Sequence, residues 1–217
     1  VSLVSVAKGG GLNCEAILTD MNQVLGSNVG HTLEVIESIE YLINNKKNKR
    51  LEIITNELAA SILIMTKKMN KNNALKKINE VINNGKAAEN FEKMVSGLGG
   101  PNKLLNNYNS YLPKTSYVDQ IIAPKNGFIQ SIQTRNLGLI LIDLGGGRKQ
   151  IDDKIDFSVG FENVIEVGKI VTSSTPLMQV HTSSKNDFDK VKNRLQSCFE
   201  IGGKKVNELN TIHKIIN

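Results

Sequence analysis

The sequence predicts an α/β protein with a helical first part and a β-rich second part. A short apolar run at residues 14–18 leads into a polar loop with two glycines and then into a segment with helical spacing. Four more helical segments follow, and after Lys114 short runs of β-forming residues alternate with Gly, Pro, Asn and Asp. The first pattern is typical of α/β domains and the second of small β units. We therefore place a domain boundary near residues 112–116.

The composition is that of a soluble globular protein. The chain has 217 residues, of which 40% are hydrophobic and 22% charged, enough to bury one large core or two modest ones. It contains no apolar run long enough to span a bilayer and no recognisable targeting peptide, so we expect a cytoplasmic protein. The first residue is Val1 rather than Met, which suggests a fragment. Cys14 and Cys198 fit no metal-binding spacing, so we expect free thiols.

The net charge of +6 does not indicate a nucleic-acid binding surface. Only four of the 27 basic residues are arginines, whereas contacts to bases and phosphates favour the arginine fork. The lysines instead recur on the predicted helix faces, as at Lys67, Lys71 and Lys76. We interpret them as solvated side chains and expect no nucleic-acid partner.

In the first part, each element follows from spacing and stop signals. Residues 1–8 resemble a helix end that is stopped by three glycines, and residues 14–18 resemble a short buried strand. A helix capped by His31 or Thr32 should carry Leu33, Ile36 and Ile39 on one face. Apolar residues at intervals of three and four predict the remaining helices over 51–68, 73–83, 87–95 and 103–112.

In the second part, the runs are shorter and richer in β-branched residues. We expect strands over residues 118–123, 127–134, 137–144, 164–171 and 177–181, and an edge strand over 213–216. One helix, over residues 187–201, should interrupt them, because Phe188, Val191 and Leu195 have helical spacing. Gly145–Gly147 with Arg148 could form an anion nest, but a hairpin turn is the better interpretation because no predicted helix follows them.

The loop after the first strand is the main candidate for a functional site, since ligands of α/β proteins gather beyond the carboxyl ends of strands. Asp20 and Asn22 stand at that strand end, where turn-forming bonds to the backbone are the favoured interpretation. The three histidines are far apart in sequence, so we expect isolated polar or packing roles for them. We interpret the acidic pair Asp152 and Asp153 as part of a solvated turn.

Five segments in order resemble landmarks of the pyrimidine-nucleoside phosphorylases, and among them the bacterial thymidine phosphorylases most closely. They are AILTDMNQVLGSNVGHTLEV, INNGKAAENFEKMV, NYNSYLP, DLGGGRKQ and KIDFSVGF. The resemblance covers nearly the whole chain and implies only the C-terminal portion of such an enzyme. Residues 1–112 would be the C-terminal part of an α/β domain with a mixed sheet. Residues 116–217 would be a β-rich domain resembling a barrel-sandwich hybrid.

The family catalyses reversible phosphorolysis: phosphate attacks the anomeric carbon of thymidine, giving thymine and 2-deoxyribose 1-phosphate. Its Lys-His-Ser-Thr-Gly-Gly phosphate loop and its base-binding Arg, Ser and Lys lie upstream of the matching part. No such loop occurs in these 217 residues, so we assign no catalytic and no substrate-binding residue. The resemblance implies that this chain is inactive by itself, and that the intact enzyme is a homodimer formed through a helical domain that is missing here.

One family site would be represented in part. These enzymes bind a monovalent cation, such as potassium, through two loop carbonyls, a carboxylate on the following helix and two ligands from the phosphate loop. The matching positions here are the carbonyls of Leu25 and Asn28 and the carboxylate of Glu37. Oxygen ligands of this kind suit a hard cation. The alternative is that the loop is a tight turn and that Glu37 is an exposed helical carboxylate. No organic cofactor is implied.

Two other functions remain to be compared with phosphorolysis. The runs APKNGFIQSI and VGKIVTSSTPLMQVH resemble the half-motifs of biotinyl and lipoyl carrier domains. Such carriers modify a lysine at a hairpin tip, usually in a Met-Lys-Met or Asp-Lys-Ala context, which neither Lys125 nor Lys169 provides. A phosphoribosyltransferase would require a diphosphate-binding glycine loop and acidic magnesium ligands, which we do not find in the sequence.

Overall fold

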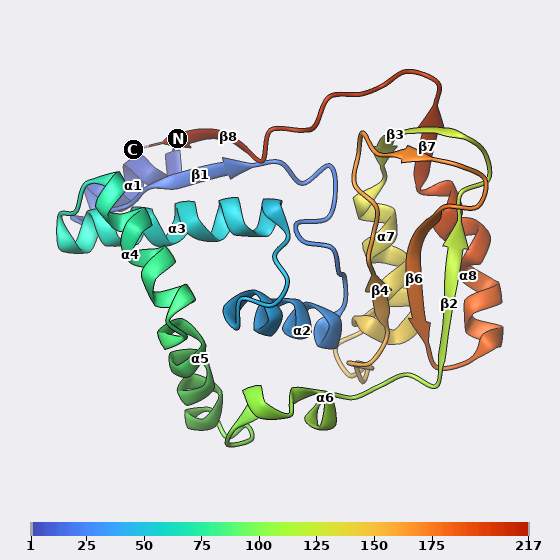
Figure 1. Ribbon diagram of the computed structural model, residues 1–217, viewed down its shortest axis with the longest axis horizontal. Helices are drawn as coiled ribbons and strands as arrows, with labels where there is room; N and C mark the ends of the chain where they lie inside the picture. The colour runs from blue at the N-terminus through green and yellow to red at the C-terminus, as the bar shows by residue number, and fades with distance from the viewer. Residues whose placement is uncertain (1, 217) are drawn as a thin grey trace.

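The structure is a computed structural model that describes residues 2–216, and it confirms the α/β class with a small β-rich part (Figure 1). Helices dominate the first part, and within the described residues eight short strands form three small sheets. The helices are α1 (Ser2–Gly9), α2 (His31–Leu42), α3 (Lys49–Lys67), α4 (Lys71–Asn83), α5 (Lys86–Gly97), α6 (Tyr108–Tyr111), α7 (Thr134–Leu141) and α8 (Lys185–Ser197). No helix within residues 2–216 is long and apolar enough to cross a membrane.

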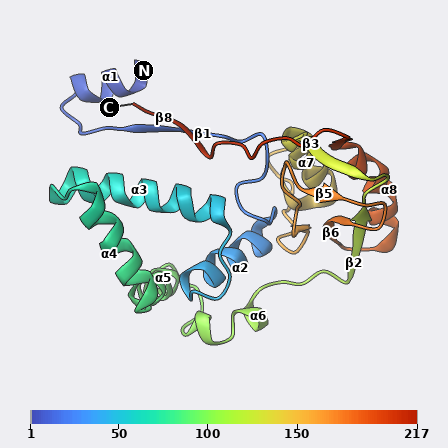
Figure 2. The same cartoon turned by 45° about the horizontal axis from the view of Figure 1, so that its top comes forward.

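The strands lie in one ribbon and two three-stranded sheets. The strands are β1 (Ala16–Thr19), β2 (Tyr117–Ile122), β3 (Gly127–Ile132), β4 (Gly160–Glu162), β5 (Ile170–Val171), β6 (Pro176–Thr182), β7 (Phe199–Gly202) and β8 (Ile212–Ile216). The order is β2-β6-β4 in one sheet and β5-β3-β7 in the other, with all pairs antiparallel. The ribbon joins β1 to β8, so the last strand pairs with the first (Figure 2).

The helical part builds a modest core of its own. In α3 and α4 the asparagines Asn48 and Asn70 serve as N-caps, each with its side-chain oxygen accepting backbone N–H groups of the first turn. The helices α3 and α4 pack side by side, and α5 continues beyond them (Figure 1). The buried side chains here are Tyr41, Ala60, Ala74, Ile78 and Ile82.

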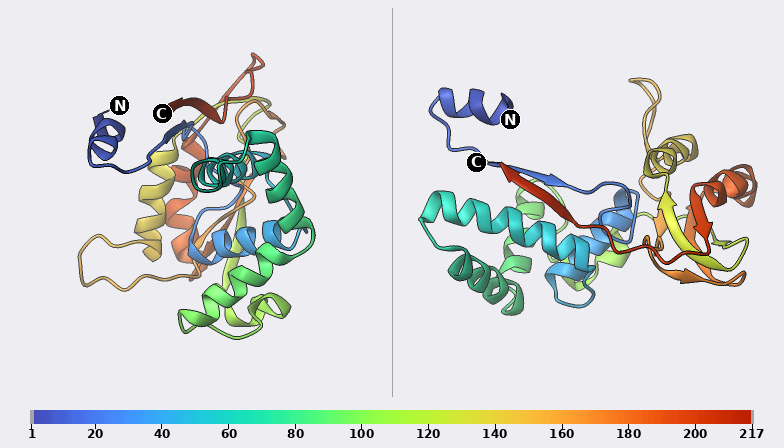
Figure 3. Two further views of the ribbon diagram at one scale, coloured as in Figure 1. Left: turned by 90° about the vertical axis from the view of Figure 1, so that its left-hand side faces the viewer. Right: turned by 90° about the horizontal axis from the view of Figure 1, so that it is seen from above.

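The β-rich part contains the larger core. Its two sheets and the helices α7 and α8 enclose one apolar cluster, with Phe161, Phe188 and Leu195 almost completely buried. Burial of such side chains is the main favourable term in folding. The loop between Gly146 and β4 extends away from this core, and Ile151 at its tip is 89% exposed (Figure 3).

Most of the predicted elements are present, and the differences have physical causes. The predicted strand over 137–144 is wrong: these residues belong to α7 and to the π-helical turn η2 (Ile142–Gly146). Leu137, Ile140 and Leu141 fit helical spacing equally well, and a short apolar run cannot separate the two states. The hairpin predicted at Gly145–Gly147 is therefore also wrong, and Gly145, with a φ of 93°, ends a helical segment.

Three further element boundaries and one predicted helix cap differ from the structure. The predicted strand over 164–171 shortens to β5, and the predicted helix over 187–201 ends at Ser197 and continues as β7. The predicted helix over 103–112 is a 3-10 turn, η1 (Leu104–Asn106), followed by α6. Neither His31 nor Thr32 caps α2, since the capping position is Gly30, which contributes no side-chain bond. The prediction for residue 1 lies outside the described residues.

Candidate functional site

The loop between β1 and α2, residues 20–30, connects the two parts of the molecule (Figure 1). Val29 forms an antiparallel bridge with Phe161 of β4, with N···O distances of 2.8 and 2.7 Å in the two directions. The Val164 N–H donates to the carbonyl of Ser27 at 2.8 Å. The loop therefore extends the β2-β6-β4 sheet by one short bridge, although it belongs to the helical part by sequence.

Side chains strengthen this connection. Gln23 is 5% exposed, and its Oε1 accepts the Val167 N–H at 3.0 Å. The Thr134 hydroxyl, at the start of α7, donates to the carbonyl of Met21 at 3.0 Å. The Asn163 N–H donates to the side-chain oxygen of Asn28. Buried polar groups are stable only when they are paired in this way, so the loop has little conformational freedom.

Two glycines allow the close approach. A Cβ on Gly30 would lie 2.6 Å from the carbonyl oxygen of Val159, and Gly30 has a φ of 121°. A Cβ on Gly160 would lie 2.5 Å from the carbonyl oxygen of Val29. Both contacts are to backbone atoms, which cannot move aside easily. The bridge between loop and sheet thus requires residues without a side chain at both positions.

Glu37 on α2 holds the loop from its other side. Its Oε1 accepts the Ser27 N–H at 2.7 Å, and its Oε2 accepts the Asn28 N–H at 3.3 Å. A Cβ on Gly26 would lie within 2.3 Å of this carboxylate. Glu37 is half-buried rather than an exposed helical carboxylate. Its carboxylate positions the loop that the sequence singled out.

The three residues predicted to bind a monovalent cation line one cavity. Leu25, Asn28 and Glu37 contribute to a cleft of about 440 Å³ between the loop, α2 and the start of α7. Within residues 2–216, no N–H group donates to the carbonyl of Leu25 or to that of Asn28. Two unpaired carbonyls and a carboxylate are the donor set that a hard cation prefers, so these residues fit part of such a site. The cation itself stays a prediction.

A buried ion pair lies at the end of β1. Asp20 is 1% exposed, and Arg50 Nη2 donates to its carbonyl oxygen at 2.8 Å and to Oδ2 at 3.3 Å. Asn22 donates to Asp20 Oδ1 at 2.7 Å, which is a bond between two side chains and not the expected bond to the backbone. The sequence did not indicate Arg50 as a partner, because it lies 30 residues away at the start of α3. Arg50 itself is 6% exposed.

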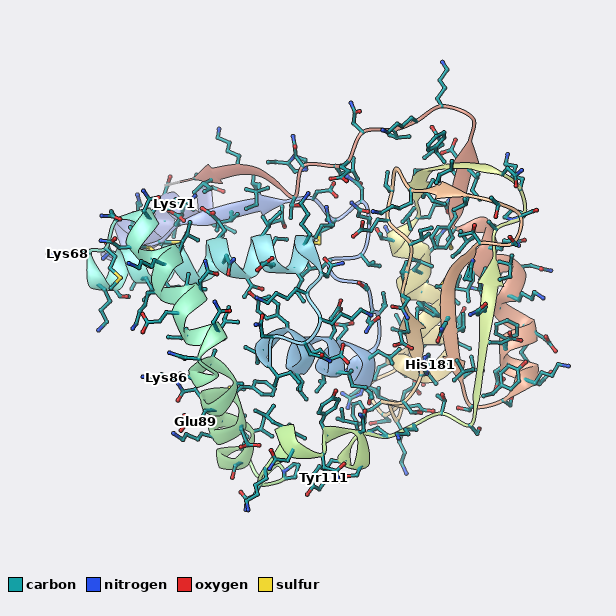
Figure 4. All side chains as sticks on the ribbon, in the orientation of Figure 1. Lys68, Lys71, Lys86, Glu89, Tyr111 and His181 are labelled. Carbon is teal, nitrogen blue, oxygen red and sulfur yellow. The ribbon has the colours of Figure 1, made fainter. Side chains whose placement is uncertain are left out.

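The histidines occupy three separate places. His31 packs edge-on against Phe157, with its Nε2 3.3 Å from the carbonyl of Gly146. His181 lies on the β-rich part, 3.1 Å from Glu162 (Figure 4). His213 lies 3.8 Å from Asp20. The carboxylate neighbours of His181 and His213 were not evident from the sequence, but no nucleophile accompanies either pair in the described contacts. Among residues 2–216 there is no cluster of three His, Cys, Asp or Glu side chains able to hold a metal ion.

The basic residues are distributed as surface side chains. Lys68 and Lys71 lie at the corner between α3 and α4, and Lys86 lies at the start of α5, far from His181 (Figure 4). Lys71 pairs with Glu57 at 2.7 Å. Exposed pairs of this kind contribute little to stability. Their arrangement agrees with the interpretation of the lysines as solvated.

Asp143 and Asp156 are among five aspartates of the β-rich part whose pKa is lowered. At Asp143, hydrogen bonds from Lys149 and then Arg194 lower the pKa of the carboxyl group. At Asp156, burial by itself raises the pKa, but hydrogen bonds from the hydroxyl and N–H of Ser158 and from the Ser183 hydroxyl bring it below its usual value. Both groups stabilise the segment around the exposed loop that precedes β4. Neither adjoins an unpaired nucleophile, so their role is structural.

Comparison with known protein families finds a match within the β-rich part. Residues 128–202 match the model of the pyrimidine nucleoside phosphorylase C-terminal domain. The match runs from β3 to β7 and includes β4, the strand that the loop at residues 20–30 joins. It also includes the run VGKIVTSSTPLMQVH, which resembles a carrier half-motif. This portion of the chain is thus similar to the C-terminal domain of the pyrimidine nucleoside phosphorylases.

Proposed function

We propose that this chain is the C-terminal portion of a thymidine phosphorylase. The reaction would be the reversible phosphorolysis of thymidine to thymine and 2-deoxyribose 1-phosphate, a step of nucleoside salvage in the cytoplasm. The observation that carries the proposal is the junction between the matched domain and the loop at residues 20–30. The sequence of this loop region, TDMNQVLGSNVG, is the segment that most resembles the thymidine phosphorylases, and the loop joins the matched domain at Phe161.

Phosphorolysis requires an oriented phosphate and donors that stabilise the charge developing on the departing base. The 217 residues contain no phosphate loop of the kind the family uses, and the described residues bring together no group of three His, Cys, Asp or Glu side chains that could hold a metal ion. In our proposal this chain contributes the loop at residues 20–30, which borders the active site without contacting the reacting atoms. Further polypeptide supplies the residues that contact phosphate and base, and also the helical domain through which the intact enzyme forms a homodimer.

The loop would also hold a potassium ion in the intact enzyme. Leu25 and Asn28 would contribute their carbonyls and Glu37 its carboxylate, and the remaining ligands would come from the phosphate loop. A bound cation would fix the loop and add positive charge close to the phosphate. The two unpaired carbonyls beside Glu37 support this assignment.

The activity is tested by measuring phosphate-dependent release of thymine. We expect no release by the purified chain, and release when the chain is produced together with its N-terminal part. Uridine is assayed in parallel, and faster turnover of thymidine is the expected result. Activity of the isolated chain would contradict our assignment of the catalytic residues to other polypeptide, and lack of activity with both parts present would contradict the phosphorylase proposal itself.

The cation assignment is tested separately in the intact enzyme. Glu37→Gln keeps an oxygen that can accept the Ser27 N–H but removes the negative charge. We expect the potassium dependence of the rate to be lost, with the enzyme still folded. Glu40→Gln, on the same helix and outside the cleft, is the matched control and should keep the dependence. An unchanged potassium dependence in Glu37→Gln would rule the assignment out.

A further inference from the structure

A second cleft, which shares Gln23 of the same loop with the first, has no assigned role. It has a volume of about 410 Å³ and lies between the start of α3, the turn at residues 166–169 and the segment 208–212 that leads into β8. These three segments come from distant parts of the sequence. Ligand sites are common at such junctions, and the volume is in the range of small-molecule sites.

The inner wall of this cleft is unusually polar. Gln23, Arg50 and Thr211 line it, and they are 5%, 6% and 9% exposed. They account for three of the eight buried polar or charged residues within residues 2–216, and a fourth, Asp20, contacts Arg50. Polar groups are costly to bury unless they are paired. Their concentration at one cleft therefore calls for an explanation.

Several donors in this wall lack partners. Arg50 uses Nη2 to contact Asp20, but its Nε and Nη1 are buried and have no hydrogen-bond partner. The Oε1 of Gln23 accepts the Val167 N–H, while its amide nitrogen reaches solvent and donates to no residue within 2–216. The hydroxyl of Thr211 also forms no hydrogen bond in the described part of the chain, but it is not among the buried unpaired atoms and therefore reaches solvent. The wall therefore contains several hydrogen-bond donors that have no acceptor within the described residues.

The start of α3 adds positive charge to the same place. Lys49 and Arg50 occupy the first turn of this 19-residue helix, where the helix dipole is already positive. Asn48 accepts the N–H groups of Arg50 and Leu51 but not that of Lys49. Basic residues in a first turn are unfavourable unless an anion lies nearby. Asp20 offsets the charge of Arg50, and the remaining positive charge is offset in part by Glu52 in the same turn and by Glu208 on the rim.

The acidic residues at the cleft lie on its rim and are already paired. Glu208 lies 3.5 Å from Lys49, and both side chains are more than three-quarters exposed. Glu166 lies 3.5 Å from Lys169 and also accepts a hydrogen bond from Asn48. None of these carboxylates contacts Gln23, Thr211 or the unpaired nitrogens of Arg50. The rim therefore leaves the donors of the inner wall unsatisfied.

We propose that this cleft binds a small oxyanion, held by the amide of Gln23, the hydroxyl of Thr211 and the charge of Arg50. Gln23 lines both this cleft and the cleft of the predicted cation. The loop at residues 20–30 thus presents donors on one side and unpaired acceptors on the other. The proposal does not depend on phosphorylase activity, because it concerns only residues of this chain.

The test is a titration of the full chain with inorganic phosphate and, separately, with sulfate, at constant ionic strength set by chloride. Backbone amide shifts are followed by NMR. We expect saturable shifts centred on Gln23, Thr211 and the start of α3 with at least one of the two anions. Absence of saturable shifts at these residues with both anions would overturn the proposal.

Variants separate this site from general charge effects. Gln23→Glu keeps the acceptor for the Val167 N–H but replaces the donors with a negative oxygen, and should weaken binding by roughly tenfold or more. Thr211→Val is nearly isosteric and should weaken it several-fold, which keeps the test valid if the first variant does not fold. Gln120→Glu makes the same charge change on the exposed strand β2 and should have no effect. Unchanged affinity in both Gln23→Glu and Thr211→Val would also refute the site.

Discussion

Two glycines decide how closely the helical and β-rich parts can approach one another. A Cβ on Gly30 would lie 2.6 Å from the carbonyl oxygen of Val159, and a Cβ on Gly160 would lie 2.5 Å from that of Val29. Both distances are too short for a real Cβ. Gly30 has a positive φ, but Gly160 does not. A substitution of Gly160 therefore tests the close contact without adding backbone strain. A conventional analysis of motifs would assign these glycines to turns. Their role is in fact to bring two backbones together.

Gly160→Ala should destabilise the protein by about 1–3 kcal/mol, because the added methyl group would overlap the carbonyl of Val29. The free energy of unfolding is measured by urea denaturation. Gly138→Ala is the matched control: Gly138 lies within α7 with open space around its Cβ position, so alanine should stabilise the helix by roughly 0.5–1 kcal/mol. Equal effects of the two substitutions would contradict the close approach at Gly160.

Asp156 should make stability depend on acidic pH. Its pKa is lowered in the folded state by the serine hydrogen bonds, which outweigh burial. Its contribution is therefore present above the ordinary aspartate value of about 4 and is lost as the pH falls through the lower folded value. Asp156→Asn should flatten the decrease in urea midpoint over this acidic range. An unaltered pH profile in the variant would show that other carboxylates dominate.

Residue contacts were only partly predictable from the sequence. The residue types at Leu25, Asn28 and Glu37 came from a family resemblance, and the structure places them around one cleft. The partnership of Asp20 with Arg50 could not have been found, because nothing in the local pattern links a strand end to a helix start 30 residues later. Spacing rules describe neighbours on one element, whereas this contact depends on how two elements pack.

At the scale of elements, long amphipathic segments were predicted well and short apolar ones were not. The helices α3, α4 and α5 begin and end close to the expected residues, because their apolar stripes repeat over several turns. The segment 137–144 was predicted as a strand and is a helix with a π-turn. The strand β4 was not predicted at all, since three residues carry no recognisable period.

The strand β8 should be necessary for the order of β1. In residues 2–216, β8 is the only strand that pairs with β1, and the Asp20 N–H also donates to the carbonyl of Thr211. A chain that ends at Asn210 should lose hydrogen-exchange protection in residues 16–19 while β6 remains protected. His213→Ala removes an exposed side chain without altering the ladder and should retain protection. Persistent protection of β1 in the shortened chain would contradict this dependence.

At the scale of the whole molecule, two separate cores are joined through one loop. Among residues 2–216 the helical core contains five buried residues and the β-rich core nineteen, so the helical part depends more on its neighbour. The bridge between Val29 and Phe161 and the Gln23 contact with Val167 form part of this connection. The sequence pointed to the loop as a ligand site, but its structural role as the connection between cores follows only from the fold.

We therefore expect both parts to unfold together while the bridge is intact. Val29→Pro removes the N–H that donates to the Phe161 carbonyl, and should let the helical part unfold at a lower urea concentration than the β-rich part. Hydrogen exchange monitored by mass spectrometry reports on both parts, through α2–α4 and β6. Val29→Ala keeps the backbone bonds and should preserve a single transition, although at a slightly lower midpoint. Coincident unfolding of the two parts in Val29→Pro would mean that other contacts, such as the returning strand β8, are sufficient to couple the cores.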